Sequence, residues 1–252
     1  MKNFIPIAVV ASLATIASAG DTVTPGVIFG SGNANGGFTI ANGGGIELGL
    51  RAKVRYNSGG GPENTFNYDG VDSYSFDPAD GNPPANRAMW NFEFSVNSDV
   101  AGTTANKLNA FTYELSMFKV NADGTNPADA FTFDPINTLY ADHSIGDNST
   151  TAATDTIAGD PGTYAALISS NNVAQNSWNY GFFNGAGTGP LEGIDPSKVG
   201  TYVIRLSAFD GAGATVASDT IYVTVVPLPT AAFAGLGLLG ALGGIQTIRR
   251  RK

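Results

Sequence analysis

The residues best suited to hold a ligand are four aspartates in the stretch NYDGVDSYSFDPADGN, residues 67–82: Asp69, Asp72, Asp77 and Asp80. Ca²⁺ prefers carboxylate and carbonyl oxygens from flexible loops, so this stretch, which we interpret as loop-like, is a candidate calcium site. Its spacing differs from that of an EF-hand loop. Because Asp is also a frequent turn residue, Asp-Pro and Asp-Gly turns are the alternative explanation.

His143 is the only histidine of the chain, so any histidine-based triad or zinc site would have to use it. Neither a G-x-S-x-G turn nor an H-E-x-x-H sequence accompanies it. We therefore interpret it as an ordinary loop histidine, although Asp142 directly precedes it. Asp142, Asp147 and Asn148 form a second, weaker group of candidate calcium ligands.

Hydrolysis of a glycoside would need two carboxyl groups on opposite sides of a cleft. The glutamates available for this role are Glu47, Glu63, Glu93, Glu114 and Glu192. Glu93 and Glu114 fall on the polar faces of predicted strands, where acids are solvated or pair with cations of the next strand. Since no catalytic partner stands at a recognisable spacing, the sequence predicts no enzyme. A secreted glycosidase is kept as an alternative.

Two further groups favour binding over catalysis. The first is the basic stripe of the body, Arg51, Lys53 and Arg55, which would pair with acids on the next strand or contact an anionic polysaccharide. The second is an aromatic group that could stack on sugar rings if exposed, although packing in the core is more common: Trp178, Tyr180, Phe182 and Phe183. A surface-displayed carbohydrate-binding module is therefore a second alternative.

The elements that would position these residues are strands. Apolar and polar residues alternate with a period of two over residues 46–56, 90–97, 111–117, 202–208 and 221–225. No segment of the body shows a convincing apolar period of 3.6. Asp-Pro and Asp-Gly pairs such as Asp160-Pro161 and Asp210-Gly211 predict turns between the strands. The expected fold is all-β, an antiparallel β-sandwich of jelly-roll or Ig-like type.

Two stretches of the body differ from the isolated alternating runs, one by its composition and one by its likeness to a hairpin. Residues 30–45 are rich in Gly and Asn and are expected to form a loop or a frayed edge. The stretch from Gly200 to Val226 is similar to the closing hairpin of Ig-like or cadherin-like surface domains. That likeness covers about a tenth of the chain, and a fold by itself names no function.

The composition excludes several classes of protein. With no cysteine there is no disulfide framework, thiolate nucleophile or zinc–thiolate site. Charged residues make up only 13% of the chain, which favours an exported β protein over a cytoplasmic helical one. Five of the 13 Lys and Arg residues lie at the two ends, which leaves eight against 21 acids, so nucleic acid is not an expected partner.

The N-terminus has the order of a secretory signal peptide. Lys2 gives a positive start, residues 4–16 are apolar, and Ala17 and Ala19 form an A-x-A site for signal peptidase, so that Gly20 would be the first mature residue. A buried hydrophobic element of the domain is the alternative.

The C-terminus predicts a membrane anchor. From about residue 230 to 248 the chain is almost entirely apolar or Gly, about the length that crosses a bilayer. The cations that follow, Arg249, Arg250, Arg251 and Lys252, would stay on the cytoplasmic side and keep the body outside. Just before the span, Pro227 and Pro229 exclude a regular helix and favour an extended stretch that a protease can bind.

This order of a short proline motif, a Gly-rich apolar span and a basic cluster resembles the PEP-CTERM sorting signal of bacterial exosortase substrates. The motif here is Val226, Pro227, Leu228, Pro229 and Thr230, with Leu228 in place of the usual acid, so it is a Pro-Leu-Pro variant. The resemblance implies transient anchoring, cleavage near residues 227–230 by an exosortase-like enzyme, and transfer to the cell surface or the extracellular matrix. A permanent transmembrane anchor is the alternative.

Together these patterns divide the chain into a signal peptide at 1–19, a β-sandwich ectodomain at 20–225 and a sorting and anchor segment at 226–252. The expected function is that of an exported, non-catalytic surface or matrix protein. Its expected partners are signal peptidase, an exosortase-like enzyme, the membrane and exopolysaccharide, and Ca²⁺ is the one cofactor that the sequence suggests.

Overall fold

The computed structural model describes residues 21–26, 33–85, 87–128, 130–138, 140–183 and 199–226. The predicted signal peptide, its cleavage site at Ala19-Gly20, the sorting motif from Pro227 onward and the basic tail lie outside these residues. The strands are β1 (Thr39–Gly43), β2 (Ile46–Val54), β3 (Ser73–Phe76), β4 (Trp90–Asn97), β5 (Thr112–Lys119), β6 (Phe131–Phe133), β7 (Ser144–Gly146), β8 (Thr156–Ile157), β9 (Val173–Asn179), β10 (Gly200–Phe209) and β11 (Thr215–Val225). The helices are α1 (Pro161–Ser170) and the short 3₁₀ turns η1 (Pro78–Asp80), η2 (Leu108–Ala110) and η3 (Tyr180–Phe183).

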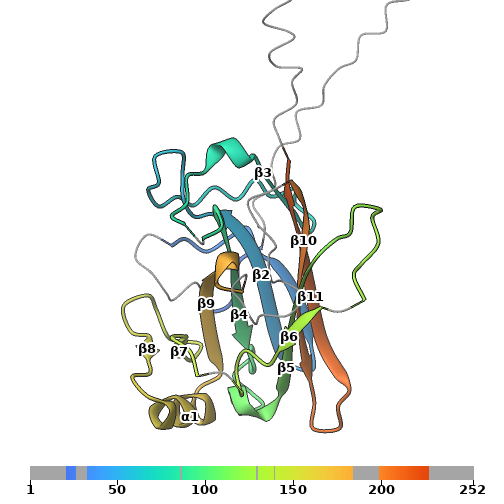
Figure 1. The fold of residues 1–252 in the computed structure, drawn as a ribbon. Coiled ribbons are helices and arrows are strands. Elements are labelled where there is room, and N and C mark those ends of the chain that lie inside the picture. Colours follow the sequence, from blue (N-terminus) through green and yellow to red (C-terminus); the bar gives the residue numbers. More distant parts are fainter. Residues whose placement is uncertain are drawn as a thin grey trace, which may run out of the picture.

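The strands form two facing sheets, which makes the fold an all-β sandwich (Figure 1). One sheet has the order β1-β2-β4-β9-β7-β8 and the other β3-β11-β10-β5-β6. All strand pairs are antiparallel except β3 with β11, which is parallel. The second sheet is therefore mixed, which corrects the expectation of a purely antiparallel sandwich.

The five predicted strands are confirmed as β2, β4, β5, β10 and β11. Their apolar residues face inward and form one core between the sheets, in which Trp90, Phe92 and Leu50 are completely buried. The predicted Asp210-Gly211 turn joins β10 to β11, where Asp210 Oδ1 accepts backbone hydrogens from Ala212 and Ala214. Period-two alternation thus predicts these five strands and their core residues, but not β1, β3 or β6 to β9.

The outer face of the six-stranded sheet is covered by the segments 21–26 and 33–38. Asp21 pairs with Phe38 in an isolated β-bridge, and Asn35 exchanges two hydrogen bonds with the backbone of Val23. A Cβ added at Gly49 of β2 would lie 2.5 Å from Val23 Cγ1, so the covering segment packs directly on the strand. Polar side chains on this face are consequently buried.

Helix α1 was not predicted. Asp160 caps it by accepting a hydrogen bond from the Thr163 amide, and Pro161 occupies its first turn. The Asp160-Pro161 pair therefore starts a helix, which corrects the prediction of a turn. Only Tyr164 and Ile168 of this helix are buried, which is too short an apolar stripe to give a recognisable period.

The Gly- and Asn-rich stretch before β2 includes β1, which lies at the edge of the sheet as expected but pairs with β2 in regular register, so this part is neither a loop nor frayed. Nowhere in the part of the chain that the structure covers is there a helix long and apolar enough to cross a membrane.

Candidate functional site

A polar cleft of about 380 Å³ opens on the outer face of the six-stranded sheet. Its walls come from the segment before β1, the loop after β2, and the β7 and β8 region. The lining is rich in amide, carboxylate and cationic groups: Asn33, Lys53, Arg55, Pro62, Glu63, Asn64, Asn91, Asp142, Ser144, Asp155, Ile157, Asn176 and Ser177. Its volume lies at the lower end of the range of about 300–1,000 Å³ that is typical of small-ligand sites.

A buried charge cluster lies beside this cleft. Arg51 of β2 and Glu93 of β4 are register partners and form an ion pair, and Lys53 Nζ lies 2.5 Å from Glu93 Oε1. This confirms the predicted cross-strand pairing for Arg51 and Lys53. The side chains are 0–4% exposed, however, so neither a solvated Glu93 nor an exposed basic stripe is present. The sequence missed this burial because the covering segments come from elsewhere in the chain.

Two features hold the Arg51 guanidinium in place. It lies between the rings of Phe38 and Phe66, at 4.2 and 4.7 Å from their centroids. Its Nη1 donates to the carbonyl oxygens of Ala34 and Gly36, at 2.8 and 2.6 Å. Burial lowers the pKa of Arg51, and Glu93 opposes this shift.

Lys53 connects the charge cluster with the cleft. Its Nζ donates to Asn33 Oδ1 at 2.7 Å and to Asn64 Oδ1 at 2.9 Å. Burial lowers the pKa of Lys53, Glu93 raises it, and the positive charges of Arg51 and Arg55 lower it further.

Ser144 gives the cleft a polar group that is not used by the fold. It is 1% exposed, and its Oγ has no hydrogen-bond partner among the described residues. It pairs with Gln175 in register, which places it on the outer face with the other lining residues. A buried hydroxyl without a partner costs free energy, and at 1% exposure this one is enclosed by the fold.

Two of the four aspartates of the candidate calcium site, Asp69 and Asp77, accept hydrogens from backbone amides, and Asp72 accepts one from the Ser73 hydroxyl. Asp69 Oδ1 accepts hydrogens from the amides of Val71, Asp72 and Ser73, and Asp77 caps η1 through the amide of Ala79. Burial would raise the pKa of Asp69, but these amide donors lower it. The stretch is also not one loop, since it contains β3.

The second group of calcium candidates is divided between different contacts. Asp142 lines the cleft, Asp147 accepts hydrogens from the amide and hydroxyl of Ser149, and the Asn148 side-chain amide donates to the Asp99 carbonyl. Among residues with described side chains, which exclude Asp80, no three metal-binding groups lie close enough together to hold an ion.

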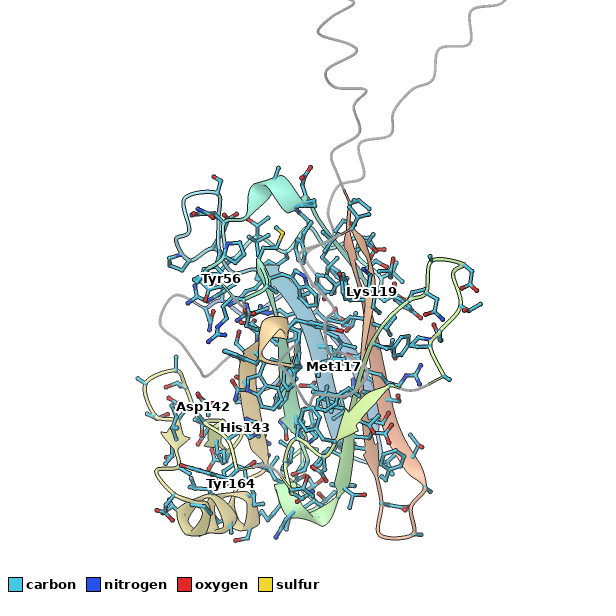
Figure 2. The ribbon with its side chains drawn as sticks, viewed as in Figure 1. Tyr56, Met117, Lys119, Asp142, His143 and Tyr164 are labelled. Carbon is cyan, nitrogen blue, oxygen red and sulfur yellow. The ribbon has the colours of Figure 1, made fainter. Side chains whose placement is uncertain are left out.

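His143 is a core residue, which corrects its interpretation as a loop histidine. It is completely buried, directly before β7, beside the rings of Phe94, Tyr164 and Trp178 (Figure 2). Its Nε2 lies 2.7 Å from the carbonyl oxygen of Pro135, which can only accept, so Nε2 carries the proton. Nδ1 then accepts from the amide of Asn176. Burial lowers the pKa of His143 to about 4.

The proposed sugar-stacking aromatics are also mainly core residues. Trp178 is 7% and Tyr180 0% exposed, so neither can present a ring face to a sugar. Phe182 is 51% exposed, with the Arg87 guanidinium over its ring. Phe183 is half-buried and lines a small apolar groove of about 240 Å³ with Phe131, Phe133 and Thr138.

The glutamates do not converge on one site. Glu47 is buried and accepts a hydrogen from the Thr24 amide, Glu63 lines the cleft, and Glu114 is exposed on β5, as expected of a strand's polar face. Glu192 lies outside the described residues. The carboxyl groups of the cleft are thus those of Glu63, Asp142 and Asp155, and sequence reasoning did not bring these three together.

One buried acid was missed by sequence reasoning. Asp219 is 7% exposed and faces the core from β11, where its Oδ2 accepts a hydrogen bond from Thr39 Oγ1 at 2.8 Å. The signal was available, because Asp219 stands in phase with Ala217 and Ile221, which also face inward. Burial raises the pKa of Asp219 to about 6.

Comparison with protein-family models, with curated proteins and with solved structures gave no match.

Proposed function

We propose that this chain is an exported, non-catalytic surface or extracellular-matrix protein that is anchored transiently by its C-terminal segment and released by an exosortase-like enzyme. The observation that carries the proposal is the position of the fold between the two predicted processing sites. Asp21, directly after the predicted first mature residue Gly20, already pairs with Phe38 in the fold. At the other side β11 ends at Val225, and the Val226 amide donates to the Phe76 carbonyl at 2.9 Å.

Neither cleavage would remove an element of the sandwich. Cleavage after Ala19 and near residues 227–230 would leave β1 to β11 complete, so the processed body would stay folded. In this proposal the body, whose finer class is jelly-roll or Ig-like, is flanked before processing by a signal helix at 1–19 and a transmembrane helix at about 230–248.

Two contacts support a non-catalytic body. His143 is enclosed by aromatic rings and both of its ring nitrogens are engaged, so it is not available as a general base to a substrate in solution. Glu93 is held by two cations under the covering segments. Both groups serve the fold.

Intact-mass measurement of the protein from the medium, the cell surface and the membrane of its host tests the proposal. We expect a surface or released form that starts at Gly20 and ends between Val226 and Thr230. A matched variant with Pro227→Ala and Pro229→Ala keeps the span and the basic tail, and should stay in the membrane with its tail intact. If every wild-type molecule keeps residues 249–252 and stays in the membrane, the tail is a permanent anchor and the sorting proposal is wrong.

The polar cleft favours a second function, binding of a saccharide. Its lining contains both hydrogen-bond donors and acceptors, as the hydroxyl groups of a sugar require. Its three carboxyl groups outnumber its two cations, which favours a neutral over an anionic sugar. This places the candidate site away from Trp178 and Tyr180, where the sequence had suggested it.

Calorimetric titration with neutral mono- and disaccharides and with a uronic acid tests this second function. Asp155→Ala should weaken binding at least several-fold, while Glu114→Ala, an exposed acid on the opposite sheet, should leave it unchanged. Lack of saturable binding to all these sugars would leave the structural role alone, and hydrolysis of a bound sugar would favour the glycosidase alternative.

A further inference from the structure

We propose that the side chains of Lys53 and Asn33 join in an intramolecular amide bond, with loss of ammonia, and so fasten the covering segment to β2. The two side chains are already in contact, since Lys53 Nζ donates to Asn33 Oδ1 at 2.7 Å. The amide carbon, Cγ, is bonded directly to this oxygen, so a small change of the side-chain torsions of Lys53 and Asn33 brings Nζ to Cγ. Held in this way, the two groups react as one molecule and not as two. The proposal does not depend on export or sorting.

The charge balance of the cluster favours the reaction. Arg51, Lys53 and Glu93 carry two positive charges and one negative charge, and all three side chains are 0–4% exposed. One buried cation is therefore in excess, and an excess buried charge is costly. Formation of the amide removes the charge of Lys53 and leaves Arg51 and Glu93 as a neutral ion pair.

The surroundings also prepare Lys53 as a nucleophile. A lysine attacks a carbonyl carbon only as the neutral amine, and burial beside other cations is what makes that form accessible. Burial and the charges of Arg51 and Arg55 lower the pKa of Lys53, against the effect of Glu93. Because Arg51 also balances Glu93, the cluster does not need Lys53 as a cation.

Glu93 can transfer the protons of the reaction. Its Oε1 lies 2.5 Å from Nζ and can accept the ammonium proton as a general base. Nζ then attacks Cγ of Asn33, the Nζ–Cγ bond forms, and the Cγ–Nδ2 bond breaks as the nitrogen takes protons from the carboxyl group and from Nζ. The ammonium side chain and the amide thus give a secondary amide and one ammonium ion, and no oxidant or reductant is needed.

Asn33 is preferred to Asn64, the other amide in contact with Nζ, for two reasons. Its contact is shorter, at 2.7 against 2.9 Å. Asn33 also directly precedes Ala34. Arg51 of β2 donates to the carbonyl oxygens of Ala34 and Gly36, so the backbone of this segment is fixed against β2. The bond would supply a covalent link to a chain that has no cysteine.

Intact mass under denaturing conditions tests the bond. Wild type and Lys53→Arg are produced from the full chain in the same host, so that processing at the ends is the same for both. After the mass difference between Lys and Arg is subtracted, we expect the wild type to be lighter than the variant by one ammonia, about 17 Da. Peptide mapping of wild type should find residues 33 and 53 in one branched peptide, with no tryptic cleavage after Lys53.

Three controls make the result decisive. Asn64→Ala should keep the ammonia loss and Asn33→Ala should abolish it, and the opposite pattern would overturn the assignment to Asn33. Ammonia loss by cyclisation at Asn35-Gly36 would persist in Lys53→Arg, so it cannot be mistaken for the bond. If wild type and Lys53→Arg differ by the substitution alone, or if the branched peptide is missing from wild type, the proposal is wrong. Peptide mapping of wild type decides the question even if a variant fails to fold.

Discussion

Replacing Asp219 with Asn should make the stability of the protein depend steeply on pH. In the wild type, two buried groups titrate in opposite directions over the same pH range. Asp219 on β11 has its pKa raised by burial from 3.8 to about 6, whereas His143 beside β7 has its pKa lowered by burial from 6.5 to about 4. The substitution removes one of the two effects and leaves the other visible.

The sign for Asp219 follows from its preference for the protonated form in the folded state. Between pH 3.8 and about 6 the folded protein binds more protons than the unfolded chain, so the free energy of unfolding falls as pH rises. A pKa shift of about two units contributes about 3 kcal/mol to the free energy of unfolding, and this contribution is lost in full above pH 6. The group is 7% exposed, so solvent screens this effect little.

The sign for His143 is opposite. Neutral His143 donates from Nε2 to the Pro135 carbonyl and accepts at Nδ1 from the Asn176 amide, and a second ring proton would face that amide donor. Its stabilising effect is complete above pH 6.5 and is lost as pH falls towards 4. The lost stability is again about 3 kcal/mol.

The two effects largely cancel. We therefore expect Asp219 and His143 together to change the free energy of unfolding of the wild type by only about 1 kcal/mol between pH 4 and 7. From pH 4 to 7, the free energy of unfolding of Asp219→Asn should rise by about 2–3 kcal/mol more than that of the wild type. The variant loses the effect of Asp219 and keeps that of His143. Urea unfolding at several pH values, followed by the fluorescence of buried Trp90 and Trp178, measures the difference.

The difference in slope, and not the absolute stability, is the decisive quantity, because the substitution also changes the hydrogen bond from Thr39 at every pH. Glu114→Gln, at an exposed acid on β5, is the matched control and should follow the wild type. Parallel curves for Asp219→Asn and wild type between pH 4 and 7 would refute the assignment of a raised pKa to Asp219.

Three further substitutions test other parts of the fold. Glu93→Ala leaves a buried guanidinium without its carboxylate and should lower the free energy of unfolding by about 3 kcal/mol or more, whereas Glu114→Ala should change it little. Gly43→Ala puts a Cβ 1.8 Å from a carbonyl oxygen of β11 and should cost about 2 kcal/mol or more, whereas Gly211→Ala, with no atom within 4 Å, should be tolerated. Asp160→Ala removes the cap of α1 and should lower the thermal midpoint by about 3 °C, with Asp160→Asn as the control that keeps a cap. Urea unfolding measures the first two variants and thermal unfolding the third. If a variant and its control change the stability equally, the contact proposed for that variant does not contribute to it.

The sequence predicted those parts of the fold that depend on local alternation. Residues 90–97 alternate strictly and form β4 with the same bounds. The same alternation placed Arg51 and Glu93 on one face of neighbouring strands, where they are register partners. Period two is a property of each strand by itself, so it can be recognised without knowledge of the rest of the chain.

What the sequence did not show depends on contacts between distant segments. Lys53 is buried under residues 33–38 and Glu47 under residues 21–26, which lie over the outer face of the sheet, and no local pattern encodes that cover. The parallel pairing of β3 with β11 joins residues about 150 positions apart. The cleft likewise combines Asn33, Glu63 and Asp155 from three separate segments, so its carboxyl groups could not be grouped from their spacing.

Burial of the charge cluster also changes how the composition should be interpreted. Eight Lys and Arg residues lie between the two ends of the chain, and Arg51 and Lys53 of these are buried. The surface that the structure describes therefore lacks two of the three cations of the basic stripe, and acids outnumber cations on it. Since a surface of this kind repels anions, an anionic polysaccharide is a less suitable partner than the exposed basic stripe had suggested. A neutral saccharide in the polar cleft meets no such repulsion, and this is why the titration with neutral sugars and with a uronic acid separates the two possibilities.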